Sequence, residues 1–255
     1  MADSNICHFS NRVAFVTGAA GNIGVALCRL LSAHGVSIAA ADMSLETLSS
    51  RLACIPNNTV RFYQVDIRDR DSINDAVSAA IKDFGHIDIL FNNAGIWNHS
   101  DVKGVQRFEQ MDYGQWTNLL RINLDGTMMC CQALLPHMIA NGYGRIVNTA
   151  SISGEVGLPG YADYAAAKAG VIMFSKTLAM ENAAYGITVN CVSPGMVAVG
   201  EPQPTDTTWI GRRGSAEEMA RAMVFLAADE SGFITGVDLP VEGGRTLGPI
   251  NAAKL

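Results

Sequence analysis

The sequence predicts an α/β protein with one doubly wound, parallel sheet of about seven strands and helices on both faces of that sheet. From residue 12 onward, short runs rich in β-branched residues alternate with longer amphipathic stretches. Several of these runs are apolar on successive residues, which is typical of strands covered on both faces. Strand and helix in strict alternation build parallel sheets with right-handed crossovers.

Seven strands and six helical segments follow from this pattern. The expected strands are Val13–Thr17, Val36–Ala41, Val60–Val65, Ile87–Asn92, Gly144–Thr149, Ile187–Ser193 and Val237–Val241. The expected helical segments cover about residues 23–34, 44–53, 69–84, 112–140, 161–185 and 215–227. Each strand except the last is followed by a helical segment, as parallel pairing requires.

The chain of 255 residues fits one domain, 1–255, because no linker, repeat or shift in composition divides it. Residues 1–11 form a polar N-terminal extension and 245–255 a C-terminal tail. The segment 195–214 carries two prolines and is the one long irregular stretch late in the chain. Such stretches are often active-site lids, and we expect a short substrate lid here.

Charge excludes two classes of partner. The net charge is −6, and neither nucleic acid nor an anionic membrane surface suits a chain without a basic patch. Charged residues are only 16% of the chain, against about 25% in an average soluble domain. We therefore expect part of the surface to be buried against sister subunits.

The uncharged runs 126–144 and 182–200 contain Pro, Gly and polar residues, so we expect no membrane span. The N-terminus has no apolar region typical of a secretory signal. The six cysteines show no C-x-x-C spacing, which indicates free thiols and no metal site. The chain is expected to be cytoplasmic.

A glycine-rich turn, Thr17-Gly18-Ala19-Ala20-Gly21-Asn22-Ile23-Gly24, follows the first strand. Such turns let the backbone approach a pyrophosphate at a helix N-terminus, although a tight turn without a ligand is an alternative. Asp42 ends the second strand, where a carboxylate can accept hydrogen bonds from the adenosine ribose. No Arg or Lys stands at 19–21 or at Met43 to bind a 2′-phosphate, which favours NAD(H) over NADP(H). Asp42 could instead cap the next helix, as could Ser44.

Ser151, Tyr164 and Lys168 form the candidate catalytic group. Tyr164 and Lys168 are four residues apart in a helical segment, so they share one face. A nearby ammonium favours the phenolate and lowers the pKa of a phenol toward the neutral range. Ser151 follows the fifth strand, at the edge where open α/β sheets bind ligands.

These motifs, with Asn92-Asn93-Ala94-Gly95, Pro194-Gly195 and Val241-Glu242-Gly243-Gly244 in the same order, resemble the short-chain dehydrogenase/reductase family over about residues 12–247. The resemblance implies a Rossmann-type fold and a homotetramer. The chain departs from the family pattern at Asn22, where Gly is usual, and at Val199, where Thr is frequent. The stretch 195–211 is also shorter than the usual lid.

The resemblance implies a role for each matched residue. Tyr164 would be the general acid/base, Ser151 would orient the substrate, and Asn123 would help to hold a water in a proton relay. Lys168 would hold the nicotinamide ribose and tune the pKa of Tyr164. The cofactor contacts that it implies are Gly18, Gly21, Asn22, Ile23, Gly24, Asp42, Met43, Asp66, Ile67, Asn93, Ala94, Gly95, Tyr164, Lys168, Pro194, Gly195 and Val197.

The expected function is an NAD(H)-dependent oxidoreductase that interconverts a secondary alcohol and its ketone. One alternative is a catalytically silent dinucleotide sensor, although such proteins usually lose the Tyr or the Lys. Another is an enoyl-type reductase that uses Tyr161, seven residues before Lys168. An epimerase or dehydratase of the longer branch would need a further C-terminal region. Asn123 has an alternative too, as a polar core residue that bends its helix. Trp97, His99, Glu155 and Trp209 are candidates to face the substrate.

Overall fold

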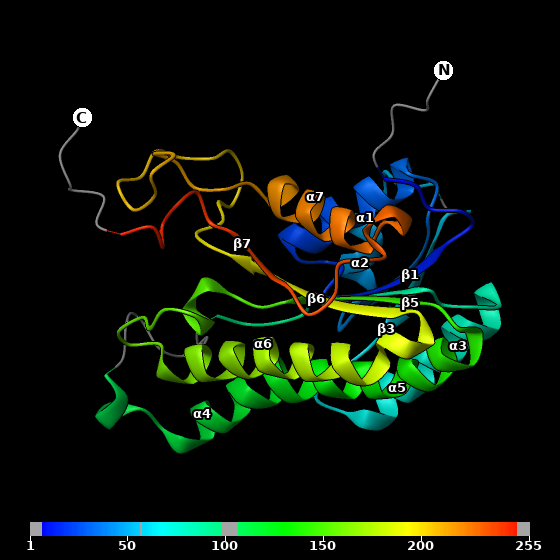
Figure 1. The fold of residues 1–255 in the computed structure, drawn as a ribbon, viewed down its shortest axis with the longest axis horizontal. Helices are drawn as coiled ribbons and strands as arrows, with labels where there is room; N and C mark the ends of the chain where they lie inside the picture. Colours follow the sequence, from blue (N-terminus) through cyan, green and yellow to red (C-terminus); the bar gives the residue numbers. More distant parts are fainter. Residues whose placement is uncertain (1–6, 57, 98–106, 249–255) are drawn as a thin grey trace.

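The computed structural model describes residues 7–56, 58–97 and 107–248 of the chain. A parallel sheet in the order β3-β2-β1-β4-β5-β6-β7 runs through its middle (Figure 1). The predicted fold class is confirmed. The strands are β1 (Val13–Thr17), β2 (Ser37–Asp42), β3 (Val60–Gln64), β4 (Ile89–Asn92), β5 (Gly144–Thr149), β6 (Ile187–Pro194) and β7 (Asp238–Val241).

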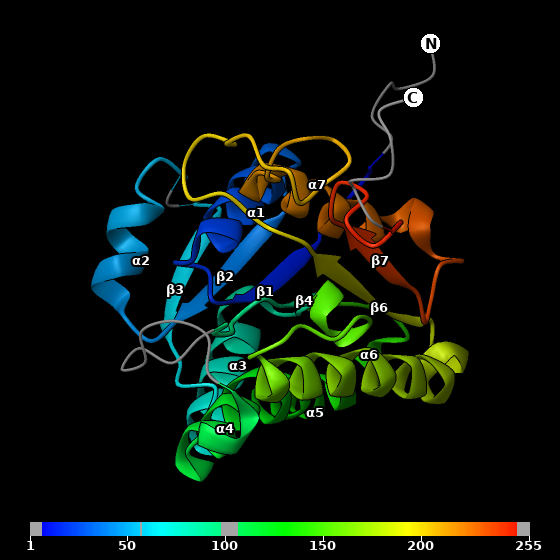
Figure 2. The same cartoon turned by 90° about the vertical axis from the view of Figure 1, so that its left-hand side faces the viewer.

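Helices cover both faces of the sheet, as Figure 2 shows from its end. One face carries α1 (Asn22–Ala33), α2 (Leu45–Arg51) and α7 (Ala216–Ala227). The other carries α3 (Arg70–Phe84), α4 (Tyr113–Leu120), α5 (Gly126–Asn141) and α6 (Ala162–Asn182). The order of strands reverses between β1 and β4, and open α/β sheets bind ligands at such a switch point.

The sequence of β1 explains the two layers. Ala14 and Val16 belong to the core between the sheet and α1 and α7, whereas Val13 and Phe15 belong to the core on the opposite face. All five residues of the strand are buried. A strand with two covered faces is therefore apolar on successive residues, and the polar Thr17 at its end donates a hydrogen bond to the carbonyl oxygen of Phe91 (3.4 Å).

The helix expected over 112–140 is interrupted. Between α4 and α5 lies a π-helical turn, η2 (Arg121–Asp125), with Asn123 at its centre. The side chain of Asn123 donates to the carbonyl oxygen of Leu119 (3.2 Å), the group that its own backbone N–H would bond in a regular α-helix. This competition explains the widened turn, and such turns occur frequently at functional sites.

The segment 195–214 forms no helix. It is tied to itself by bridges between Val197 and Gly214 and between Pro204 and Arg212. Ser215 then caps α7 together with Glu218. Of the predicted terminal segments, residues 1–6 and 249–255 lie outside the described part of the chain. Among the helices of the described residues, none is long and apolar enough to cross a membrane.

Candidate active site

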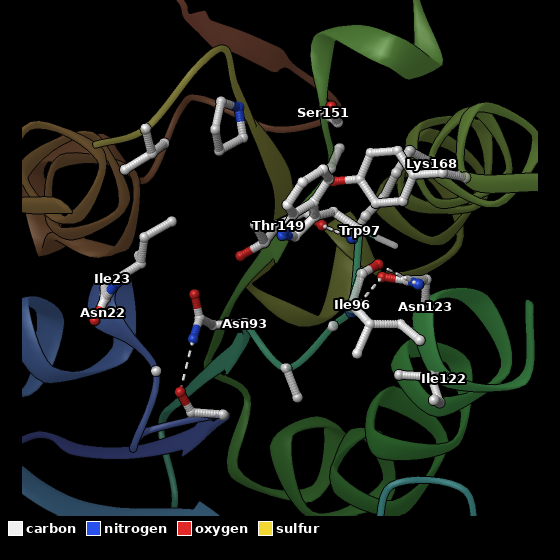
Figure 3. A pocket seen from close by; sticks show the side chains of 18 of the residues that line it. Asn22, Ile23, Asn93, Ile96, Trp97, Ile122, Asn123, Thr149, Ser151 and Lys168 are labelled. Carbon is white, nitrogen blue, oxygen red and sulfur yellow. Dashed lines mark hydrogen bonds between the residues drawn. The ribbon is translucent and has the colours of Figure 1, made fainter. Parts of the chain in front are cut away.

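A cavity of about 1150 Å³ opens at the carboxyl ends of the strands. Figure 3 shows Asn22 and Ile23 on one side of it, Ser151 and Lys168 on the other, and Asn93 between them. Pockets that bind drug-sized ligands have volumes of about 300–1,000 Å³. The volume of this cavity therefore exceeds that of a typical pocket for one drug-sized ligand.

The glycine-rich turn forms the floor at the β1 end. Gly18 has a φ of +64°, and a Cβ there would lie 2.7 Å from the Cα of Ala94. A Cβ on Gly24 would overlap the carbonyl oxygen of Gly18. Gly18, Gly21, Asn22 and Ile23 line the cavity, whereas Gly24 does not. Gly24 instead lets α1 pack closely against the turn.

Asp42 closes the adjacent corner. Its carboxylate accepts hydrogen bonds from the backbone N–H groups of Ala20 (3.0 Å) and Met43 (2.8 Å). Ser44 caps α2 by accepting from the N–H of Thr47 (3.1 Å). The alternative role of Asp42 as the helix cap is therefore not what the structure shows.

Arg51 also contacts the glycine-rich turn, and it was not predicted from the sequence as a site residue. The Arg51 guanidinium, at the last turn of α2, donates to the carbonyl oxygen of Ala20 (2.6 Å) and to Asn22 Oδ1 (2.7 Å). Asn22, which replaces the usual glycine, thus has a partner from another helix. Arg51 lies 29 residues from Asn22 in the sequence, so no local motif links the two residues. The one signal in the sequence is that residue 51 is an arginine, which can donate several hydrogen bonds.

Asp66 and Ile67 line the cavity beyond Asp42. Asp66 pairs with Arg68, whose Nη2 lies 2.6 Å from Asp66 Oδ2. The hydrogen bonds from Arg68 lower the pKa of Asp66. Arg68 also lines the cavity, and the sequence analysis did not single it out.

Ser151, Tyr164 and Lys168 all line the same cavity. Ser151 follows β5 and caps the short helix η3 (Ile152–Gly154) through Ser153 N–H (3.1 Å). Tyr164 lies in the first turn of α6, and Lys168 lies one turn later. Lys168 Nζ donates to the carbonyl oxygen of Thr149 (2.8 Å) and lies 5.7 Å from the centroid of the Tyr164 ring.

The electrostatics of this group differ from the expectation. Burial raises the pKa of Tyr164, and a hydrogen bond with Ser151 acts in the opposite direction. The expected lowering by Lys168 is not seen. Burial lowers the pKa of Lys168 to about 8. The ammonium is bonded to the carbonyl oxygen of Thr149, and helical spacing alone does not show this contact.

Asn123 is fully buried and lines the cavity with its amide. Its Nδ2 donates to the carbonyl oxygen of Ile96 (2.8 Å), and its Oδ1 accepts from Ile96 N–H (3.3 Å). A Cβ on Gly95 would lie 2.6 Å from Asn123 Oδ1. Glycine at 95 is therefore needed for this amide to hold the loop after β4 (Figure 3).

The remaining predicted contacts also lie in the cavity. Asn93 Nδ2 donates to the carbonyl oxygen of Gly18 (3.0 Å) and joins β4 to the turn. Met43, Asn93, Ala94, Gly95, Pro194, Gly195 and Val197 all line the cavity. Val199, where the family pattern has Thr, lines it as well and is 80% exposed.

The end of the cavity beyond Ser151 has apolar walls. The rings of Trp97 and Tyr161 stack with centroids 6.2 Å apart. Tyr161 therefore serves as a wall beside Trp97. Val156, Leu158 and Met196 also line the cavity, and none of them was singled out from the sequence.

Not every candidate reaches the cavity. Glu155 and Trp209 do not line it, and His99 lies outside the described residues. Arg213 and Arg245 do line it, and neither was singled out from the sequence, although Arg245 directly follows the motif Val241-Glu242-Gly243-Gly244. In residues 7–56, 58–97 and 107–248, no group of three His, Cys, Asp or Glu side chains is arranged to hold a metal ion.

Comparison with known proteins gives the context of this site. Residues 12–208 match the sequence model described as short chain dehydrogenase. The chain is 36% identical to trans-4-hydroxycyclohexanecarboxylate dehydrogenase of Sinomonas cyclohexanicum, over 94% of each chain. It is also 36% identical to a 3-oxoacyl-[acyl-carrier-protein] reductase of Haemophilus influenzae, over 92% of this chain and 98% of the other. The structure of an NAD⁺-bound xylitol dehydrogenase matches with a TM-score of 0.85 at 32% identity, over 92% of this chain and 99% of the other.

Proposed function

Because this chain belongs to the short-chain dehydrogenase family, we propose that it is an NAD(H)-dependent oxidoreductase that interconverts a secondary alcohol and the corresponding ketone. The observation that carries the proposal is the meeting of Ser151, Tyr164 and Lys168 in one cavity with the glycine-rich turn. The names of the relatives, which include a hydroxycyclohexanecarboxylate dehydrogenase and a xylitol dehydrogenase, support the same reaction class.

The cavity suits a dinucleotide on physical grounds. The backbone at Gly18 approaches Ala94 so closely that no side chain fits between them. The N–H groups at the start of α1 have no capping side chain, so they are available to an anion such as pyrophosphate. When bound, the dinucleotide would supply the nicotinamide carbon that accepts or releases the hydride.

We assign the lining residues to the parts of that cofactor. Asp42 and Met43 would hold the adenosine ribose, Asp66 and Ile67 would border the adenine, and Lys168 would hold the nicotinamide ribose. Gly24 acts indirectly, by letting α1 pack against the turn. The other contacts are Gly18, Gly21, Asn22, Ile23, Asn93, Ala94, Gly95, Tyr164, Pro194, Gly195 and Val197.

Preference for NAD(H) is supported by the corner around Asp42. The carboxylate there faces any group on the ribose 2′ oxygen and would repel a phosphate. Arg51 is the cation that contacts the glycine-rich turn, and two of its nitrogens are already bonded to Ala20 and Asn22. It therefore fastens the turn and does not present a free guanidinium to a phosphate.

Tyr164 is the residue that transfers the proton in the proposed reaction. In the reducing direction its Oη gives a proton to the oxygen of the substrate carbonyl, and Ser151 Oγ hydrogen-bonds that same oxygen. In the oxidising direction Tyr164 Oη takes the proton from the substrate hydroxyl, and Ser151 Oγ hydrogen-bonds that oxygen as before. Burial raises the pKa of Tyr164, which keeps the phenol protonated and suits proton donation at neutral pH. Asn123 holds the loop at Ile96 in place beside this group.

Turnover tests the proposal directly. Purified protein is mixed with NAD and a panel of secondary alcohols, and with NADH and the matching ketones, while NADH absorbance is followed. We expect a change with at least one pair, and a change at least about a hundredfold slower with the Tyr164→Phe variant. Binding of NADH without turnover of any pair in the panel would favour the alternative of a dinucleotide sensor.

A homotetramer is part of the same proposal. Large apolar side chains are exposed on the outer helices and near β7, among them Met173 (62%), Met180 (76%) and Phe233 (104%). Covering them against sister chains would remove apolar surface from water. Light scattering on the purified protein measures the assembly, and a monomer would contradict it.

A further inference from the structure

Two arginines in the cavity lack the partners that its other charged groups have. Six charged side chains line the cavity: Asp42, Asp66, Arg68, Lys168, Arg213 and Arg245. The first four are bound to backbone groups or to each other. Arg213 and Arg245 make no ion pair with any described residue.

Their neighbours make the difference clear. Arg212 is bound by Glu218 through two hydrogen bonds of 2.8 and 2.6 Å, whereas Arg213, the next residue, lines the cavity. The carboxylate of Glu242, three residues before Arg245, accepts from Thr246 N–H (2.8 Å). Arg245 Nη1 is buried and has no hydrogen-bond partner among the described residues. A buried guanidinium nitrogen without a partner is costly, which points to a missing ligand.

Both arginines belong to the β6–β7 end of the sheet. Gly214, next to Arg213, pairs with Val197 just after β6. Arg245 follows β7, and Ile210 N–H donates to the carbonyl oxygen of Gly243 (3.1 Å), so the two segments pack together. In Figure 1 the gold loop and the red segment after β7 lie at the same end of the molecule. Two strands, β4 and β5, separate this end from the glycine-rich turn after β1.

The cavity that the two arginines line also has apolar walls. The stacked rings of Trp97 and Tyr161 form one wall, and Val156, Leu158 and Met196 line the same space. A ligand with a compact hydrocarbon skeleton would remove these surfaces from water. An anionic group on that skeleton would accept hydrogen bonds from these guanidinium groups and also balance their charge.

We propose that the substrate is a hydroxy acid, a secondary alcohol on a compact apolar skeleton whose carboxylate is bound by Arg245 with help from Arg213. This rests on the alcohol–ketone reaction proposed above and adds the class of substrate. The planar guanidinium fork matches a carboxylate with two parallel hydrogen bonds. The other oxyanion that could reach these arginines is the pyrophosphate of the cofactor.

Steady-state kinetics distinguish binding of a substrate carboxylate by these arginines from binding of the cofactor pyrophosphate. Alicyclic and aliphatic secondary hydroxy acids are each compared with their methyl esters, in wild type and in Arg245→Gln, Arg213→Gln and Arg221→Gln. Arg221 is an exposed arginine of α7 and serves as the matched control. We expect Arg245→Gln to lower kcat/KM for the acids roughly ten- to hundredfold, a loss typical of a charged hydrogen bond. The esters and the KM for NAD should not change. An equal loss for acid and ester, or a loss confined to the KM for NAD, would overturn the proposal.

Binding gives an answer that does not depend on turnover. Cyclohexanecarboxylate and cyclohexanecarboxamide are titrated calorimetrically into wild-type protein saturated with NADH, and into the Arg245→Gln and Arg221→Gln variants. The carboxylate should bind to wild type and Arg221→Gln, and the amide should bind weakly to all three. Equal affinity for carboxylate and amide, or no binding of the carboxylate, would refute the carboxylate site. Turnover of neutral alcohols in the same preparation would leave the proposed reaction class intact.

Discussion

The guanidinium of Arg51 donates a 2.7 Å hydrogen bond to the side-chain oxygen of Asn22, and so a residue at the end of α2 holds the glycine-rich turn at the start of α1. A second nitrogen of Arg51 binds the carbonyl oxygen of Ala20 in the same turn. This contact explains how asparagine can stand where glycine is usual.

Arg51→Ala should therefore loosen the turn. We expect the KM for NAD to rise about two- to tenfold, as the loss of one or two hydrogen bonds implies, with kcat unchanged. Asn22→Ala should have a smaller effect in the Arg51→Ala background than in wild type, because the two residues are coupled. Steady-state kinetics on the four proteins measure the coupling. Additive effects would show that the contact does not support binding.

Asp42→Ala should narrow the preference for NAD over NADP. The carboxylate would no longer bind the ribose or repel a 2′-phosphate, so kcat/KM with NAD should fall roughly ten- to hundredfold. Asp42→Asn is the matched variant, since it keeps the shape and removes the charge. The ratio of kcat/KM for the two cofactors is the measurement. An unchanged ratio in both variants would mean that this carboxylate does not read the ribose.

Tyr164→Phe should remove the proton donor and leave the cavity in place. We expect kcat to fall by about 10²–10⁴, the usual contribution of a positioned acid or base, while NADH still binds as judged by its fluorescence. Tyr161→Phe is the control, because Tyr161 serves as a wall stacked on Trp97. It should change KM more than kcat. A larger loss in Tyr161→Phe than in Tyr164→Phe would reverse the assignment.

Lys168 makes stability depend on pH in a defined direction. Its pKa is lowered from 10.5 to about 8 in the folded protein, so between these values the unfolded chain binds the extra proton. The free energy of unfolding should therefore rise with pH across this window, by an amount of the order of 3 kcal/mol. Below pH 8 both states are protonated and the gain is absent.

Urea unfolding of wild type and Lys168→Met at several pH values isolates that contribution. Burial raises the pKa of Cys28, Cys130 and Cys191 to about 12, from 9.0. Stability that these thiols contribute is present below pH 9 and is lost as the pH rises toward 12. Wild type and Lys168→Met contain the same thiols, so this loss cancels when their free energies of unfolding are subtracted. A difference that stays flat from pH 8 to 10.5 would contradict the lowered pKa of Lys168.

Asn123→Ala should act through the loop after β4. Without the amide, the N–H and carbonyl of Ile96 lose their bonds at 3.3 and 2.8 Å. We expect kcat to fall at least about tenfold, in line with unpaired buried polar groups, and Asn123→Gln not to restore it, since Gly95 leaves no space. Circular dichroism checks that the helix pair α4–α5 persists. Full activity in a folded Asn123→Ala protein would show that Asn123 only bends the helix and does not support catalysis.

Local patterns predicted most of the fold. The strand Val13–Thr17 and the strand Gly144–Thr149 have the predicted bounds, and the others shift by one or two residues. A bend at Asn123 was only an alternative in the sequence analysis, because the break depends on a side chain that bonds Leu119 inside an otherwise helical stretch. The gathering of the glycine-rich turn, Ser151, Tyr164 and Lys168 follows from the order of elements in a doubly wound sheet.

The sequence by itself determined the parallel sheet, the turn after β1 and the helical spacing of Tyr164 and Lys168. Each of these depends on residues within a few positions of one another. Only the tertiary structure decided that Arg51 binds Asn22, that Lys168 turns to Thr149, and that Arg213 and Arg245 enter the cavity. Those contacts join segments up to dozens of residues apart. Their geometry is set by how helices and loops pack on the sheet, which no local pattern encodes.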